Sequence, residues 1–135
     1  MSELTNENTQ EKTILILDDA EDLLYLMATT IDHFCGYKVL TAKSHHEVKE
    51  LGQRALNSDL AILDINLGPN EPNGVDVYRW LRDNGFTSKI FFLTGHAPTY
   101  PLVVEAAQLG DVEVLCKPIR LETLVEIVKG GYEEP

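Results

Sequence analysis

The chain has 135 residues, enough for one domain with an ordinary hydrophobic core, and its formal net charge is −11. So acidic a surface repels phosphate-rich partners, which argues against direct binding to nucleic acid or to an anionic membrane. No apolar stretch reaches the roughly 20 residues that cross a bilayer, and the polar N-terminus is unlike a signal peptide, so we expect a cytoplasmic protein. In that reducing compartment Cys35 and Cys116 are expected to be small core residues.

Three regions follow one another along the chain. Residues 1–11 are rich in Asn, Thr and Glu, a composition that predicts a disordered lead-in. Residues 12–130 alternate short apolar runs with helical patterns and form the predicted domain. Residues 131–135 are left as a tail.

Five short apolar runs predict strands, which we expect at 13–18, 37–41, 60–64, 90–94 and 112–116. A helix is predicted after each strand, at 20–34, 44–56, 75–84, 102–109 and 121–129. Gly36 is expected to end the first helix, and Ser44 with Glu47 has the spacing of a capping box for the second.

Repeated strand–helix units with strands apolar on both faces predict an α/β fold. Such strands require a parallel sheet covered by helices on both sides. Right-handed crossovers make this a doubly wound five-stranded sheet. Ligands of these sheets bind beyond the carboxyl ends of the strands, so the residues at those ends are the candidates for function.

Polar residues follow four of the five apolar runs. The first run ends in Asp18 and Asp19, the third in Asp64, the fourth in Thr94 and the fifth in Lys117. Three converging carboxylates repel one another unless a cation lies among them, and oxygen ligands suit Mg²⁺. The lysine and the hydroxyl could then bind phosphoryl oxygens while Asp64 acts as nucleophile and forms an acyl phosphate.

With these motifs, residues 12–129 resemble the CheY-like receiver domains of two-component response regulators. The resemblance rests on the strand-end elements Asp18-Asp19, Asp64, Thr94-Gly95 and Lys117-Pro118, in this order and at suitable spacing. It implies a flavodoxin-like fold with strand order 2-1-3-4-5. It also implies a phosphorylation switch rather than an enzyme with its own substrate.

The resemblance also implies roles for the strand-end residues. Asp64 would accept a phosphoryl group from a histidine kinase or a histidine phosphotransfer protein, and the phosphorylated chain would bind a downstream protein target. Mg²⁺ would be held by Asp18, Asp19, Asp64 and the backbone carbonyl of Asn66. The Lys117-Pro118 peptide bond is expected to be cis.

The sequence departs from the family pattern at two places. The loop between Asp64 and Gly74 is somewhat longer than usual, and Val114 occupies a position that is usually aromatic. In the family that aromatic side chain reports movement at the position of Thr94, which a valine cannot do in the same way. His96 lies two residues after Thr94, where the family's side chain helps to set the lifetime of the acyl phosphate. The other histidines are expected on the surface.

Two alternatives to a stand-alone receiver stay open. The first is a receiver that belongs to a longer, multidomain regulator. The second, from another class, is a Mg²⁺-dependent phosphohydrolase with an aspartyl nucleophile. Enzymes of the haloacid-dehalogenase type carry Asp-x-Asp after the first strand, whereas here Asp18 and Asp19 are adjacent and Asp64 is followed by Ile65 and Asn66.

Overall fold

The computed structural model describes residues 11–132. The predicted disorder of residues 1–10 and the end of the predicted tail, residues 133–135, lie outside the described residues. Within the described range no helix combines the length and the apolar character needed to span a membrane.

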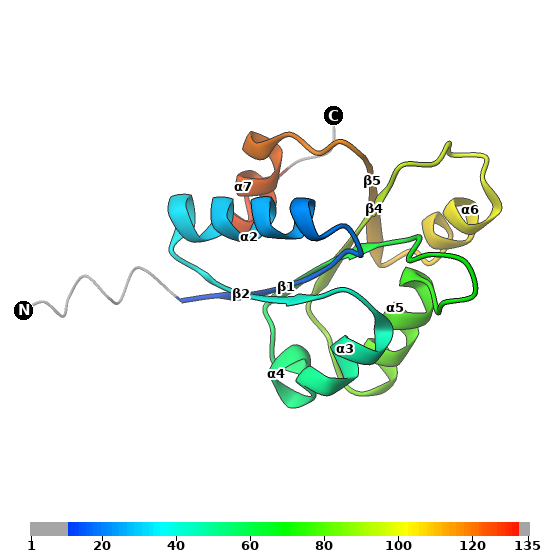
Figure 1. The fold of residues 1–135 in the computed structure, drawn as a ribbon, viewed down its shortest axis with the longest axis horizontal. Coiled ribbons are helices and arrows are strands. Elements are labelled where there is room, and N and C mark those ends of the chain that lie inside the picture. The colour runs from blue at the N-terminus through cyan, green and yellow to red at the C-terminus, as the bar shows by residue number, and fades with distance from the viewer. Residues whose placement is uncertain (1–10, 133–135) are drawn as a thin grey trace, which may run out of the picture.

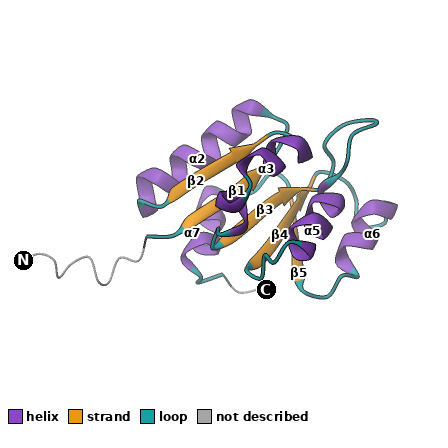
Figure 2. Cartoon of the chain, turned by 90° about the horizontal axis from the view of Figure 1, so that it is seen from below, coloured by secondary structure: helices purple, strands orange, loops and turns teal. Residues whose placement is uncertain are grey.

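The chain builds one five-stranded sheet whose strands all run parallel. The order is β2-β1-β3-β4-β5, as the resemblance implied. All strands therefore end at the same edge of the sheet (Figure 2). The strands are β1 (Thr13–Leu17), β2 (Lys38–Ala42), β3 (Leu60–Asp64), β4 (Lys89–Thr94) and β5 (Val112–Cys116).

Helices cover both faces of the sheet (Figure 1). On one face lie α2 (Glu21–Cys35) and α7 (Leu121–Lys129), and on the other lie α3 (His45–Leu51), α4 (Gln53–Leu56), α5 (Gly74–Asp83) and α6 (Pro101–Ala107). Each face has its own apolar core, because successive strand residues point to opposite sides. In β1, for example, Ile14 and Ile16 pack under α2 and α7, whereas Leu15 and Leu17 pack on the other face.

The sequence predicted one helix over 44–56, and this prediction was wrong because Gly52 divides the segment. Gly52 has φ +58° and ψ −128°, a conformation outside the helical region that glycine adopts most readily. The predicted start is confirmed, since the Ser44 side chain accepts a hydrogen bond from the Glu47 N–H. The Glu47 carboxylate accepts from Lys43 N–H at 2.8 Å, one residue before the position expected for a capping box.

The two cysteines differ in their surroundings. Cys35 is partly buried against the core beneath α2 and α7, whereas Cys116 is exposed. The prediction of a core position was therefore wrong for Cys116. It is the last residue of β5, an edge strand of the sheet whose residues are only partly covered along its length.

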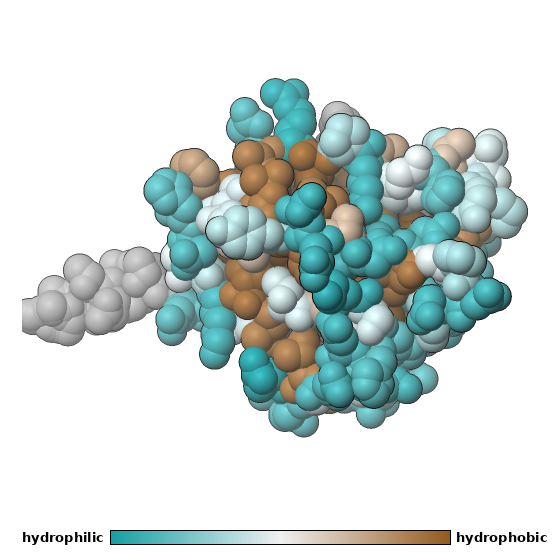
Figure 3. All heavy atoms as spheres, in the orientation of Figure 1, coloured by the Kyte–Doolittle hydropathy of each residue, from teal (hydrophilic) through white to brown (hydrophobic). Residues whose placement is uncertain are grey.

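The surface is mostly hydrophilic, as the net charge requires, but apolar side chains reach it in the region of α2 and β2 (Figure 3). Three large side chains of α2 are exposed, Tyr25 by 73%, Phe34 by 60% and Leu26 by 46%.

Candidate functional site

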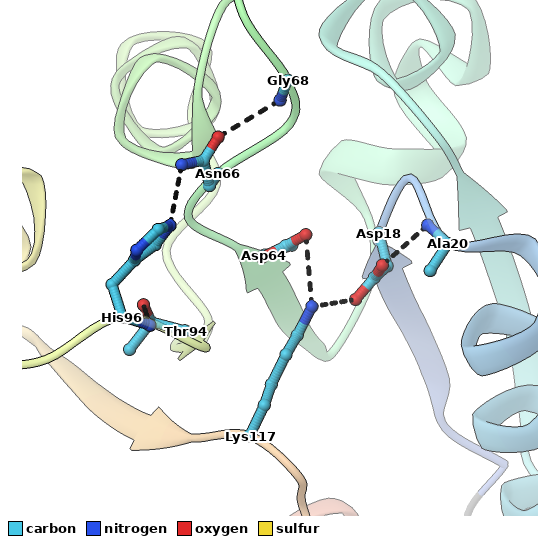
Figure 4. A network of polar contacts seen from close by, with 8 residues as sticks. All are labelled: Asp18, Ala20, Asp64, Asn66, Gly68, Thr94, His96 and Lys117. Atoms are coloured by element: carbon cyan, nitrogen blue, oxygen red, sulfur yellow. Dashed lines mark hydrogen bonds and ion pairs between the residues drawn. The ribbon is translucent and has the colours of Figure 1, made fainter.

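Backbone hydrogen bonds continue past the ends of the strands and fix the candidate residues relative to one another. Ile65 N–H donates to the Leu93 carbonyl at 2.9 Å, and Lys117 N–H donates to the Thr94 carbonyl at 2.8 Å. The loops after β1, β3, β4 and β5 thus begin from a rigid frame. Figure 4 shows the side chains that they carry toward one another.

Lys117 lies between two buried carboxylates. Its Nζ is 3.0 Å from Asp18 Oδ2 and 3.3 Å from Asp64 Oδ2. Asp18 is fully buried, and Asp64 is 4% exposed. Charges in such surroundings are stable only when they are paired, so the lysine is what allows both acids to remain ionised there. The other oxygen of Asp18 accepts a hydrogen bond from the Ala20 N–H at 2.9 Å.

Asp18, Asp19 and Asp64 form a carboxylate cluster in which one oxygen from each lies within 4.8 Å of the others. Asp19 is exposed, so the cluster opens to solvent on that side. The buried Oδ2 of Asp18 lies 3.0 Å from Lys117 Nζ, and a carboxylate oxygen that is paired in this way still has a second lone pair that could bind a cation. An all-oxygen donor set with a solvent opening fits Mg²⁺, which keeps part of its water shell.

Burial and the neighbouring charge of Asp18 raise the pKa of Asp64 from 3.8 to about 6, although Lys117 works in the opposite direction. Burial alone would lower the pKa of Lys117, but its hydrogen bond to Asp18 and the charges of both acids outweigh this effect and raise it. The lysine is therefore charged at neutral pH. Burial is the largest cause of the raised pKa of Asp64 and repulsion by Asp18 is the next, and a bound cation would favour the charged form of both acids.

Thr94 is buried at the end of β4, where its Oγ1 accepts a hydrogen bond from the His96 N–H at 2.9 Å. A hydroxyl that accepts one bond can still donate its proton to a second partner. Lys117-Pro118 is cis, which confirms the expectation from the resemblance. Thus the strand-end residues that the sequence singled out do lie at one edge of the sheet.

Gly74 supports the site in a way that the sequence analysis missed. A Cβ at this position would lie 2.2 Å from the Asp64 carbonyl oxygen and 2.9 Å from Ile65 Cα. The Gly74 N–H also donates to the Ile65 carbonyl at 2.7 Å. The longer loop after Asp64 therefore returns onto the end of β3, and only glycine permits this approach. The capping box formed by Asn73 and Asp76 then starts α5 directly afterwards.

Two histidines make ring contacts that the sequence analysis did not predict, and the expected surface position was wrong for His45, which is partly buried. The His96 ring lies between Asn66 and Tyr100. His45 packs where α3 meets α5, and its Nε2 is buried. The centroid of its ring lies 6.2 Å from that of the half-buried Trp80. The contacts of His96 with Asn66 and of His45 with Trp80 join residues more than 25 positions apart, so no local pattern in the sequence signals them.

Fold and site together define a class: a doubly wound α/β protein with an acid cluster and a lysine at the carboxyl ends of its strands, where the ligands of such sheets bind. The family model for the response regulator receiver domain matches residues 14–129. The chain therefore belongs to this family of two-component signalling proteins. Members of the family are phosphorylated and bind Mg²⁺ in an acidic pocket.

Relatives and solved structures agree with this membership. The response regulator protein TmoT of Ectopseudomonas mendocina is 30% identical over 123 residues, which are 90% of this chain and 53% of that protein. TodT of Pseudomonas putida is 35% identical over 72 residues, which are 53% of this chain and 30% of that protein. The chain thus spans about half the length of TmoT and less of TodT.

Among solved structures, the chemotaxis protein CheY4 of Vibrio cholerae superposes with a TM-score of 0.76 at 24% identity, covering 91% of this chain and all of that one (100%). A receiver domain protein from Clostridium thermocellum gives 0.74 at 26% identity, covering 89% and 93%. The first likeness shows the shared fold, and both agree with the family match.

Proposed function

We propose that this chain is a phosphorylation-dependent switch whose phosphoacceptor is Asp64. The observation that carries the proposal is the position of this carboxylate: it is buried at the end of the central strand β3, 3.3 Å from Lys117 and within the acid cluster. A carboxylate held in this way has a nearby cation for the phosphoryl oxygens and acids that can bind Mg²⁺.

The reaction follows from these neighbours. A carboxylate oxygen of Asp64 attacks the phosphorus of a phosphohistidine, the P–N bond breaks, and the electron pair leaves with the imidazole of the donor. Lys117 pairs with one phosphoryl oxygen and the Thr94 hydroxyl donates to another. Asp18, Asp19, Asp64 and the Asn66 carbonyl are the proposed ligands of Mg²⁺, which when bound neutralises developing charge.

The partners follow from the same chemistry. The phosphoryl donor is a histidine kinase or a histidine phosphotransfer protein, and the acyl phosphate changes the affinity for a downstream protein target. We place the receiver domain at residues 12–130 and propose that it acts as a stand-alone receiver in the cytoplasm. The alternative is a receiver within a multidomain regulator, and the size of the native protein on an immunoblot of source cells distinguishes the two.

Intact mass after incubation with acetyl phosphate and Mg²⁺ tests the acceptor. The wild type should gain one phosphoryl group, and Asp64→Asn should gain none. Asp83→Asn is the matched control, because it makes the same substitution at an exposed aspartate of α5. Equal labelling of Asp64→Asn and the wild type would remove Asp64 as the acceptor. Steady release of phosphate from small esters, rather than a single labelling, would favour the phosphohydrolase alternative.

A further inference from the structure

The His96 ring contacts the loop that follows the proposed acceptor. Its Nε2 is 3.0 Å from the amide nitrogen of Asn66, and the amide oxygen of Asn66 accepts a hydrogen bond from the Gly68 N–H at 3.2 Å. The second bond fixes the orientation of the amide, so its NH₂ group must face the ring. In this orientation of the amide, His96 Nε2 accepts the hydrogen bond, which requires the tautomer with its proton on Nδ1.

The face of the same ring contacts the residue at the beginning of α6. The rings of His96 and Tyr100 are stacked, with centroids 4.1 Å apart and planes inclined by 10°. Tyr100 is the N-cap residue of α6, and its own N–H bonds to Ala97 within the loop. A displacement of the imidazole would thus move a ring that is fixed to the first turn of this helix.

The backbone of His96 is joined to Thr94, since its N–H donates to Thr94 Oγ1. His96 consequently contacts three parts of the switch: the segment after Asp64 through Asn66, the buried hydroxyl of Thr94, and α6 through Tyr100. We call this set of contacts the His96 bridge. Figure 4 shows its inner half, with His96 lying between Asn66 and Thr94.

We infer that His96 is a positioning residue that transmits phosphorylation of Asp64 to the start of α6 through its stack on Tyr100. The inference rests on the proposed function. When the Thr94 hydroxyl turns to donate to a phosphoryl oxygen, its Oγ1 moves. The hydrogen bond from the His96 N–H to this oxygen then either breaks or moves the His96 backbone with it. The ring then shifts relative to Asn66, and Tyr100 moves with it. Residues 95–100 are exposed, so little packing opposes this change.

The position of Val114 agrees with this route. Val114 lies in β5, partly buried against the core beneath α3 and α5, and it is aliphatic. It therefore offers no ring that could follow Thr94 on the β5 side. The stacked pair of His96 and Tyr100 supplies aromatic rings on the α6 side instead.

Backbone amide shifts with and without beryllofluoride and Mg²⁺ test the His96 bridge in two variants. His96→Gln removes the ring but keeps a polar side chain toward Asn66, and His96→Phe keeps a ring but loses the nitrogen. Both keep the backbone N–H that bonds to Thr94. We expect the wild type to show large changes over residues 100–103, His96→Gln to show changes there several-fold smaller, and His96→Phe to retain most of them.

The response at Ile65, Asn66 and Lys117 separates this inference from the proposed function. These amides should shift in all three proteins, which shows that the phosphoryl mimic has bound at Asp64. An unchanged response over 100–103 in His96→Gln, beside such shifts, would overturn the role of His96 and leave the proposed function standing. No shifts at the acceptor site in the wild type would overturn both.

A second measurement tests the resting state of the bridge without any phosphoryl mimic. In ¹⁵N spectra of the histidine rings, His96 Nδ1 should appear as the protonated nitrogen and Nε2 as the unprotonated one at mildly alkaline pH. Asn66→Ala should remove this preference because the amide donor is gone. The opposite tautomer in the wild type would contradict the bridge.

Discussion

The buried residues around the proposed acceptor Asp64 and the loop before α6 belong to the same site but are built differently. Asp18, Asp64 and Lys117 are held in buried ion pairs at the ends of strands, where little can move. The loop of residues 95–100 is exposed, and single hydrogen bonds join His96 of this loop to Asn66 and to Thr94. This contrast supports the proposed division of roles, in which the buried side binds the phosphoryl group and the exposed loop responds to it.

Lys117→Met should have the largest effect on stability, because it leaves two buried carboxylates without their cation. The free energy of unfolding should fall by roughly 3 kcal/mol in EDTA at neutral pH, as measured by urea denaturation. Lys89→Met is the control, since it removes the more exposed ion pair with Glu113 and should cost less than about 1 kcal/mol. Equal losses in the two variants would contradict the claim that Lys117 compensates two buried carboxylates.

Asp64→Asn should stabilise the protein in EDTA, because burial and the charge of Asp18 disfavour the ionised carboxylate of Asp64 in the folded state. The pKa of Asp64 is raised from 3.8 to about 6, so the folded protein binds its proton more tightly than the unfolded chain does. The group's stabilising contribution is complete below pH 3.8 and is lost as pH rises through about 6. Above that pH the variant should gain roughly 1–3 kcal/mol.

The same comparison at low pH is the control for this prediction. The gain of Asp64→Asn over the wild type should shrink as both proteins are acidified. Added Mg²⁺ should also reduce the gain, since it binds only where the carboxylates are intact. A gain that does not depend on pH would show that the substitution acts through packing and not through charge.

Gly74→Ala should distort the backbone of the proposed acceptor at the end of β3. Its Cβ would meet the Asp64 carbonyl oxygen at 2.2 Å, so β3 or the start of α5 must shift. We expect a loss of roughly 1–3 kcal/mol and slower phosphorylation by acetyl phosphate. Gly131→Ala is the matched control, because nothing lies within 4 Å of a Cβ there and its φ is not positive. Wild-type stability in Gly74→Ala would mean that the loop does not press on β3.

Tyr100→Ala should have the smallest effect on stability, and this result would sharpen the contrast between the two regions. The side chain is 39% exposed and its ring contact is with an exposed histidine, so the free energy of unfolding should change by less than about 0.5 kcal/mol. Thermal unfolding compared with the wild type measures it. A loss of more than about 2 kcal/mol would show that the loop is part of the rigid frame.

The sequence by itself predicted the sheet, its parallel direction and the residues at its polar edge. Short continuous apolar runs are a local signal for buried strands, and Asp64, Thr94 and Lys117 stand at the ends of such runs. The order of the strands and the cis peptide bond at Lys117-Pro118 came from the likeness of these motifs to a family. Both were confirmed.

The tertiary structure decided the contacts that join distant segments. The raised pKa of Asp64 depends on how deeply the edge is buried and how near Asp18 comes, which no spacing in the sequence gives. The need for glycine at position 74 and the ring contacts of His96 likewise arise only when loops from different strands meet. Local patterns predict which elements form, whereas through-space distances set the electrostatics and couplings of the site.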